Sequence, residues 1–113
     1  MNTECIFCKI INKEIPAELI YEDDLVIALN DLNPQAPIHI LFVPKKHVEN
    51  AADLSNLSPE SMAAIFKAAS KVVDDKAITD YRSVFNTGAG AGQSIFHAHL
   101  HLLAGRKFAW PPG

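Results

Sequence analysis

The sequence predicts an α+β domain with about five antiparallel strands and two helices. Two stretches carry apolar residues at helical spacing, whereas the other apolar runs have the length of strands. Most of these strand-like runs follow one another across short turns, which favours antiparallel pairing. The 113 residues, 49% of them hydrophobic, suit one packed core, so we expect residues 1–113 to form a single domain.

The first helix is expected near the N-terminus, in TECIFCKIINKEIPA. Thr3 is a good capping residue, and Pro16 should end the helix because proline lacks a backbone N–H. Cys5 and Cys8 are three residues apart, so both thiols are expected on one helical face. The apolar stripe of this helix comprises Ile6, Phe7, Ile10 and Ile11.

Three strands are expected next. Residues 19–23 and 25–31 are short apolar runs that indicate a hairpin, and residues 33–37, with two prolines, indicate a rigid turn. Residues 38–44, IHILFVP, form a strong strand that stops at Pro44.

The second helix is expected to start at SPES. Ser58 is placed to cap it, Pro59 suits the first helical position, and Glu60 lies at the positive end of the helix dipole. The helix should run to about Asp74. Its core stripe comprises Met62, Ile65, Phe66, Ala69, Val72 and Val73.

The chain is expected to finish with a strand over 81–87, a glycine-rich connection over 88–93 and a last strand over 94–104. The terminal WPPG cannot continue a strand, because its two prolines remove two backbone donors.

Three of the five histidines fall at alternate positions of the last strand: His97, His99 and His101. Successive side chains of a strand point to opposite faces, so these three share one face. The opposite, apolar face carries Phe96, Ala98, Leu100 and Leu102. The pattern predicts a histidine-lined cleft on one side and a helix-covered core on the other.

The residues leave three interpretations of this face open. It is a solvated strand face, or two histidines chelate a zinc ion with a third from elsewhere, or one imidazole is a nucleophile assisted by a flanking histidine or hydroxyl. His97 and His101 lie ~13 Å apart at ~3.3 Å per residue, so at most two adjacent histidines serve one small centre. His39, on a separate strand, joins the cleft only if that strand neighbours the last one.

Other features narrow the function. GAGAGQS lacks the lysine of a Walker loop and leads into a strand, but it can form a backbone-rich rim for an anion. A net charge of −3 with scattered Lys and Arg argues against a nucleic-acid partner. No apolar run reaches ~20 residues, which predicts no membrane partner and a cytoplasmic protein. Thiols are reduced there, so the Cys5–Cys8 pair indicates metal binding or coincidence.

Several stretches together resemble the histidine triad (HIT) superfamily, in particular its nucleotide-binding (Hint) branch: HAHLHLL, KIINKEIPAELIYEDD, NPQAPIHILFVPKKH, AGQS and WPPG. The resemblance implies a HIT-like fold and a homodimer whose two sheets join. It also implies a purine nucleotide site on each subunit. The implied activity is hydrolysis of adenosine 5′-phosphoramidates, AMP–amines or acyl-AMP through a nucleotidyl-histidine intermediate. A dinucleoside polyphosphate hydrolase, or a nucleotide-binding interaction protein with vestigial activity, are the alternatives.

The resemblance also implies catalytic roles. His99 matches the nucleophile, and His101 matches the residue that contacts the phosphate and assists proton transfer. Ser94 matches a hydroxyl near the leaving group, while His97 and His39 match supporting histidines. The nucleophile needs its other ring nitrogen held by an acceptor, as second-shell contacts do in such sites.

The nucleotide contacts carry over in the same way. Asp31 matches the carboxylate that accepts the ribose hydroxyls, and Leu32 matches the apolar residue beside the base. The phosphate and leaving-group rim is matched by Asn86, Gly92 and Gln93, together with Ser94, His99 and His101.

Relatives with C-x-x-C at this place hold a zinc ion, and the matching residues here are Cys5, Cys8, His47 and His97. Two thiolates and two imidazoles make a closed, structural tetrahedral site. With zinc bound, His97 is a metal ligand and takes no part in proton transfer. The other interpretation is that both cysteines are small buried apolar residues.

Overall fold

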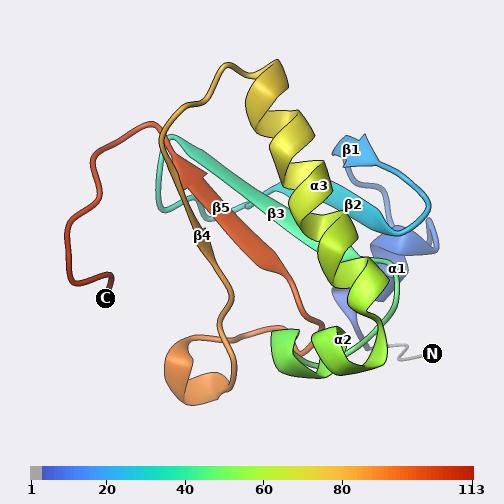
Figure 1. Cartoon of the computed structure of the whole chain (residues 1–113). Helices are drawn as coiled ribbons and strands as arrows, with labels where there is room; N and C mark the ends of the chain where they lie inside the picture. The colour runs from blue at the N-terminus through green and yellow to red at the C-terminus, as the bar shows by residue number, and fades with distance from the viewer. Residues whose placement is uncertain (1–3) are drawn as a thin grey trace.

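The computed structural model describes residues 4–113, which form a five-stranded antiparallel sheet with the strand order β1-β2-β3-β5-β4 (Figure 1). The predicted α+β class and antiparallel sheet are confirmed. The strands are β1 (Leu19–Glu22), β2 (Val26–Asn30), β3 (Ile38–Pro44), β4 (Tyr81–Val84) and β5 (Leu100–Ala104). The helices are α1 (Ile6–Ile11), α2 (Ala51–Leu57) and α3 (Pro59–Asp75), with a short 3-10 turn η1 at Ala89–Ala91.

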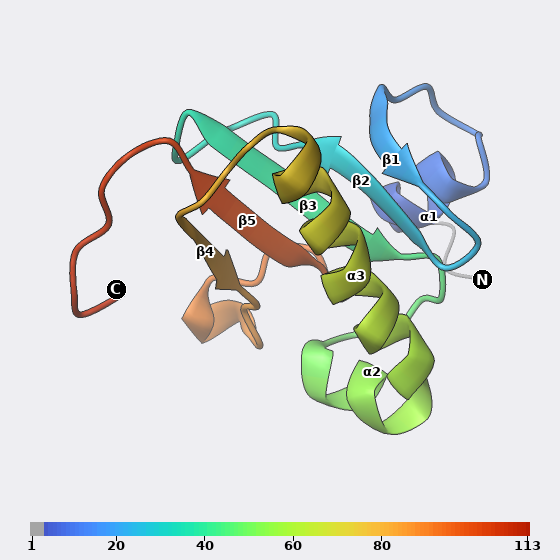
Figure 2. The same cartoon turned by 45° about the horizontal axis from the view of Figure 1, so that its top comes forward.

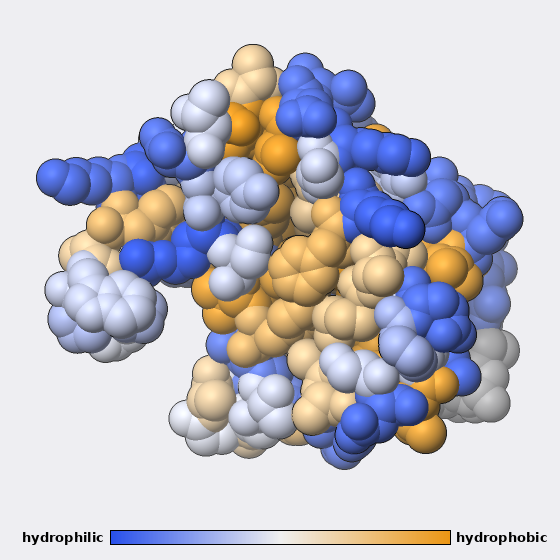
Figure 3. Space-filling model, in the orientation of Figure 1, coloured by the Kyte–Doolittle hydropathy of each residue, from blue (hydrophilic) through white to orange (hydrophobic). Residues whose placement is uncertain are grey.

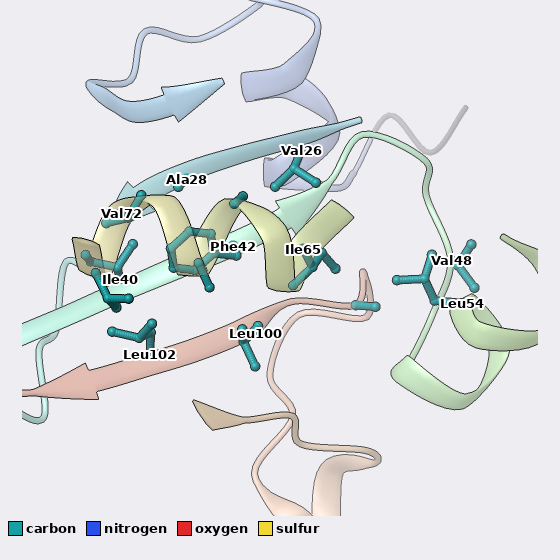
Figure 4. Packing of buried hydrophobic residues seen from close by; sticks show 14 residues of the cluster. Val26, Ala28, Ile40, Phe42, Val48, Leu54, Ile65, Val72, Leu100 and Leu102 are labelled. Carbon is teal, nitrogen blue, oxygen red and sulfur yellow. The ribbon is translucent and has the colours of Figure 1, made fainter. Parts of the chain in front are cut away.

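Helix α3 lies across one face of the sheet (Figures 1 and 2). Alternate residues of β3 and β5 point at it, and Phe42 and Leu100 belong to one buried cluster with Ile65 of the helix (Figure 4). All three are at most 1% exposed. Burial of each such side chain contributes about 1.5–3 kcal/mol. This core therefore holds β3 and β5 side by side.

The intervening residues of β3 and β5 point to the opposite face. There α1 covers one end of the sheet, where Phe7 and Cys8 pack with Leu41 and Val43. Beyond this cluster the same face carries polar residues from neighbouring strands. The half of the face that α1 leaves uncovered is therefore where a polar site can form.

Helix α2 was not expected, and it changes the role of Ser58. Asn50 caps α2 by accepting from the Asp53 N–H at 2.9 Å, and Ser58 closes the helix with its N–H on the Leu54 carbonyl. The Ser58 hydroxyl then bonds the Glu60 carboxylate at 2.9 Å rather than a free N–H of α3. The expected start of α3 at Pro59 is correct, but its serine makes no side-chain cap.

The first helix is shorter than expected. It ends at Ile11, five residues before Pro16, because Lys13 adopts φ 62° and reverses the chain. Cys5 occupies the N-cap position, and its Sγ accepts from the Cys8 N–H at 3.4 Å. Thr3, the expected cap, lies outside the described residues.

The last strand is also shorter than expected, since β5 begins at Leu100. The preceding segment leaves the sheet: the Ala98 N–H donates to the Val48 carbonyl at 2.7 Å instead of to a strand. Phe96 is 44% exposed, so it is not on the core face. Alternation holds only from Ala98 onward, and side-chain hydrogen bonds position the residues before it.

Within residues 4–113, no helix is long and apolar enough to span a membrane.

Candidate functional site

A hydrogen bond to the backbone orients the ring of His99. Its Nδ1 lies 2.8 Å from the carbonyl oxygen of His97. A carbonyl oxygen only accepts, so Nδ1 carries the proton, and Nε2 of the neutral ring keeps its lone pair. An imidazole in this tautomer can attack an electrophile through Nε2.

Burial keeps the His99 ring neutral. The residue is 7% exposed, and the ring of Phe7 packs edge-on against it with centroids 5.1 Å apart. Loss of hydration lowers the pKa of His99 below its ordinary 6.5, and this outweighs the opposing effects of the His97 carbonyl and Asp31. The ring is therefore in its nucleophilic, uncharged form at neutral pH.

His39 and His101 form a hydrogen-bonded pair beside His99. Because β3 and β5 are neighbours, His39 Nε2 lies 2.9 Å from His101 Nδ1. The Gln35 N–H donates to His39 Nδ1 at 3.0 Å, so His39 carries its proton on Nε2 and donates it to His101. His101 consequently has its own proton on Nε2, and its ring centroid is 4.8 Å from that of His99.

The charge state of this pair depends on its neighbours. Burial, followed by the nearby His99 and His39, lowers the pKa of His101 to about 4, and Asp31 opposes the shift. The Asp31 Oδ2 lies 3.4 Å from His39 Nε2. An anion beside His101 would favour its charged form and raise its pKa. His101 can take up this proton only at Nδ1, and the His39 Nε2–H must then release that nitrogen.

A second cluster, formed by Cys5, Cys8, His47 and His97, lies behind His99. Its four donor atoms are all within 4.8 Å of one another. The Nδ1 of His97 is 3.4 Å from Cys5 Sγ, 3.7 Å from Cys8 Sγ and 3.0 Å from His47 Nδ1. Cys8 Sγ is 3.2 Å from His47 Nδ1. The chain thus gathers these donors from sequence positions up to 92 residues apart.

This donor set fits a zinc ion. Tetrahedral zinc with thiolate and imidazole ligands places its donor atoms roughly 3.3–3.8 Å apart, close to the separations in the cluster. The His97 Nε2–H donates to the Pro44 carbonyl at 2.7 Å, which leaves its Nδ1 lone pair facing the thiols. Burial lowers the pKa of His97 to about 4, which keeps that lone pair available. The residues therefore suit a closed metal site.

His97 connects the two clusters. Its ring belongs to the Cys–His group, and its carbonyl oxygen holds the Nδ1–H of His99. Its residue is fully buried, with Phe7 packed edge-on against the ring at 5.7 Å. Contacts that fix the position of His97 therefore also fix the carbonyl oxygen that orients the ring of His99.

The other residues expected to contact a nucleotide lie in several places. Asn86 lines a hollow of about 260 Å³ with the histidine pair. Gly92 has φ 97° and lies beside Asn86, so a Cβ at this position would come 3.7 Å from the Asn86 Nδ2. Leu32, next to Asp31 in sequence, is 98% exposed.

Gln93 and Ser94 lie away from this hollow. Gln93 is buried, and its amide accepts from the Gly88 N–H at 2.9 Å and donates to the Glu49 and Ile95 carbonyls at 2.7 and 3.1 Å. It therefore shapes the glycine-rich loop from within. Ser94 is exposed and borders a hollow of about 280 Å³ beside the Cys–His cluster.

Sequence reasoning missed two residues at the histidine pair. Arg82 and Arg106 both border the hollow that contains His39 and His101. Arg82 alternates with the exposed Tyr81 and Ser83 in the strand segment YRSV. This alternation is the only sequence signal that indicates its position. Arg106 follows β5 in an irregular segment, so no local pattern could have placed it there.

Comparison with known proteins agrees with this geometry. Residues 4–108 match the family described as scavenger mRNA decapping enzyme C-term binding. The whole chain is 49% identical to the whole of an uncharacterised HIT-like protein of Synechocystis sp.. It is 40% identical to the purine nucleoside phosphoramidase of Escherichia coli K12, with 94% of this chain and 91% of that protein covered.

A HIT family hydrolase from Legionella pneumophila Philadelphia 1 has the same fold, with a TM-score of 0.90 at 44% identity over 96% of this chain and 99% of that one. A histidine triad protein from Clostridium difficile superposes equally well, with a TM-score of 0.90 at 43% identity over 96% of each chain. Family match, sequence identity and fold agree, and the chain therefore belongs to the histidine triad (HIT) family.

Proposed function

We propose that this chain is a hydrolase that cleaves adenosine 5′-phosphoramidates, AMP–amines and acyl-AMP, with His99 as the nucleophile. The observation that carries the proposal is the bond from His99 Nδ1–H to the His97 carbonyl, which leaves Nε2 as the reactive nitrogen. The name of the E. coli relative, purine nucleoside phosphoramidase, supports the phosphoramidate part of this substrate class.

In the first step, the His99 Nε2 lone pair forms a bond to the α-phosphorus of an AMP–amine. The phosphorus–nitrogen bond to the amine breaks, and its electron pair goes to the amine nitrogen. That nitrogen takes a proton from His101, which acquired it when the phosphate anion bound beside the ring. The products are a free amine and AMP bonded to His99.

In the second step, a water oxygen attacks phosphorus. The bond from phosphorus to His99 Nε2 breaks, its electron pair returns to the ring, and AMP leaves. The water proton passes to His101, which restores the acid for the next cycle. His39 positions the neutral form of His101 through the 2.9 Å hydrogen bond.

The proposed nucleotide site uses residues on both sides of the histidines. Asp31 accepts the ribose hydroxyls, and the exposed Leu32 contacts the base. Asn86 and Gly92, which lie together, border the phosphate. Gln93 acts through the shape of the loop, whereas Ser94 lies in the separate hollow beside the Cys–His cluster and is given no role in the reaction.

The proposed zinc site is structural and uses Cys5, Cys8, His47 and His97. When bound, the ion would supply a rigid crosslink between α1 and the segment before β5, with no open ligand position for chemistry. His97 contributes its ring to this site and its carbonyl to His99, so it orients the nucleophile and transfers no proton.

We also propose a homodimer joined through β4, one of the two edge strands of the sheet. An apolar area covers the neighbouring surface of α3 (Figure 3), where Phe66 is 48% exposed and contacts the ring of Phe85. Tyr81 at the start of β4 is 44% exposed. A sedimentation measurement of wild type and Phe66→Asp tests this; two monomers, or two equally stable dimers, would contradict it.

The nucleophile is tested by AMP release from an AMP–amine substrate. We expect His99→Ala to reduce kcat by at least about 10³-fold, as loss of a nucleophile does elsewhere, whereas the exposed control Lys67→Gln retains wild-type turnover. Mass spectrometry of wild type quenched in alkaline denaturant, in which a phosphorus–nitrogen bond to histidine survives, should show AMP attached to His99. Comparable turnover by His99→Ala would refute the assignment, and release of AMP only from dinucleoside polyphosphates would favour that alternative activity.

A further inference from the structure

The two cysteines lie in the first turn of α1, close enough to be joined to each other. Ile6 and Phe7 between them are helical, which places the Cα atoms of Cys5 and Cys8 about 5 Å apart. A disulfide spans Cα separations of about 4.4–6.8 Å. The Cys8 N–H donates to Cys5 Sγ at 3.4 Å, and the two Sγ atoms lie within 4.8 Å of each other. Formation of a disulfide therefore requires rotation of the side chains rather than unwinding of the helix.

A hollow gives small molecules access to this pair through Cys5. The hollow has a volume of about 280 Å³, and Cys5 lines it together with His47 and Ser94. Two apolar side chains at its rim, Ile6 and Phe96, are each 44% exposed. A water molecule occupies about 30 Å³ in the liquid, so a small hydroperoxide fits into the hollow. An oxidant therefore reaches Cys5 first.

The hollow lies away from the edge proposed for the dimer. Figures 1 and 2 show α1 near β1, whereas β4 is the opposite edge strand of the sheet. Phe66 and Tyr81, which mark the proposed dimer joint, are not among the residues that line the hollow. The cysteine pair therefore stays accessible in the proposed dimer.

The cysteine pair also contacts the groups that orient the nucleophile. The ring of Phe7 packs edge-on against His97 at 5.7 Å and against His99 at 5.1 Å. The Nδ1 of His97 lies 3.4 Å from Cys5 Sγ and 3.7 Å from Cys8 Sγ, while its carbonyl accepts from His99. A disulfide brings the two sulfur atoms to ~2.05 Å, so their contacts with the His97 ring change. Through Phe7 and the His97 carbonyl, this change reaches the ring of His99.

A disulfide and the proposed metal site exclude each other. Two thiolates that bind one tetrahedral zinc ion at ~2.3 Å have their sulfur atoms ~3.8 Å apart. In a disulfide the separation is ~2.05 Å, and neither sulfur remains a thiolate. The metal-bound pair is therefore protected from oxidation, and the oxidised pair binds no zinc.

From this geometry, and resting on the proposed function, we infer that Cys5 and Cys8 are a redox-active pair which hydroperoxides convert to a disulfide, and that this disulfide lowers the activity of His99. With hydrogen peroxide, Cys5 Sγ bonds to one oxygen, the oxygen–oxygen bond breaks, and the other oxygen leaves as water with the thiol proton. Cys8 Sγ then bonds to the sulfenic sulfur of Cys5, and the hydroxyl leaves with the Cys8 proton as a second water. The two sulfurs lose the two electrons that the peroxide gains, and a dithiol reductant reverses the change.

Oxidation of the purified protein tests the first half of the inference. The chain has two cysteines, so an internal disulfide lowers its mass by two hydrogens and removes both titratable thiols. We expect both changes in metal-free wild type treated with hydrogen peroxide, and dithiothreitol should reverse them. Zinc-loaded wild type should keep its thiols under the same treatment, and elemental analysis should find no zinc bound to the oxidised protein. Thiols that persist in the metal-free protein, or a disulfide only between chains, would overturn the inference.

AMP release from an AMP–amine tests the second half. We expect kcat of oxidised wild type to be about 10- to 100-fold lower than that of the reduced protein, the size of effect that a misplaced reacting group has. Dithiothreitol should restore kcat. Peroxide should leave kcat of Cys5→Ser at its value before treatment, and zinc-loaded wild type is a second control that needs no substitution. Equal kcat of oxidised and reduced wild type, or a loss that dithiothreitol does not reverse, would overturn the inference.

The ring nitrogens of His99 report the coupling without any substrate. Long-range ¹H–¹⁵N spectra of the reduced protein should show the tautomer with the proton on Nδ1, and oxidation should shift both nitrogen resonances reversibly. Failure of reduced wild type to release AMP would overturn the proposed function. Resonances of His99 that oxidation leaves unchanged would overturn this inference, whether or not the protein turns over the substrate.

Discussion

Replacement of Cys8 by alanine tests the metal site most sharply, because its two expected effects separate by condition. Cys8 is 5% exposed, with Sγ 3.2 Å from His47 Nδ1 and 3.7 Å from His97 Nδ1. In the metal-free protein the variant loses one buried sulfur atom. With zinc it also loses one of four ligands. The free energy of unfolding should therefore fall much more with zinc than without it.

The magnitudes follow from burial and from mass action. Loss of one buried heavy atom costs about 1 kcal/mol. Zinc at about 1,000 times its Kd stabilises wild type by about 4 kcal/mol, and an affinity weakened about 100-fold leaves about 1.4 kcal/mol of that gain. The difference in free energy of unfolding between wild type and Cys8→Ala should thus grow from about 1 kcal/mol in chelator to about 4 kcal/mol in zinc.

Urea unfolding of both proteins, in chelator and in buffered zinc, measures these four free energies, and elemental analysis measures bound metal. Val43→Ala is the control, since Val43 is fully buried in the same apolar cluster but offers no ligand. It should lower the free energy of unfolding equally in both conditions. An equal zinc-induced gain in wild type and Cys8→Ala, or no gain in wild type, would refute the metal site.

Three further outcomes are expected. Gly105 has φ 94°, and the new Cβ of Gly105→Ala would lie 2.9 Å from the Cβ of Pro37, so this variant should lower the free energy of unfolding by about 2–3 kcal/mol. Gly88 has φ 89° with no atom within 4 Å of an added Cβ, so Gly88→Ala should lower it by about 1 kcal/mol. Equal losses in thermal unfolding would contradict the close contact at Gly105. The pKa of His101 is about 4 in the folded chain and 6.5 in the unfolded chain. As the pH falls, the unfolded chain therefore binds the proton first, and folding becomes less favourable. Wild type should therefore lose stability in urea between about pH 6.5 and pH 4, and His101→Gln should lose less; parallel curves would exclude this cause. His39→Phe should lower kcat for AMP release by about 10- to 100-fold with a smaller change in KM, because His101 loses its hydrogen-bond partner; unchanged kcat would show that the pair is dispensable.

Local patterns in the sequence predicted most of the fold. The alternation of Ala98, Leu100 and Leu102 indicates a core-facing strand because successive side chains of a strand point to opposite faces. Helical spacing indicates α3 for the same reason. Helix α2 was not predicted because its seven residues are too few to show a helical period, and its start depends on the Asn50 side chain and on the burial of Leu54.

The histidine motif and the cysteine pair also indicated which residues carry the chemistry. The tautomers of these histidines could not be predicted from the motif itself. The tautomer of His99 depends on a carbonyl two residues earlier, whose direction follows from the irregular segment before β5. The lone pair of His97 depends on the Pro44 carbonyl, 53 residues away in the chain. Both are decided by packing between distant segments.

The sequence by itself determined the α+β class, the order of its main elements and the residue types available for a nucleophile, a proton donor and a metal. Tertiary structure alone decided that β3 lies beside β5, which creates the His39–His101 pair, and that α1 faces the segment before β5, which gathers the four metal donors. It also decided that Arg82 and Arg106 meet at Phe108. The physical reason is range: periodicity reports contacts within a few residues, whereas these contacts depend on how whole elements bury their apolar faces.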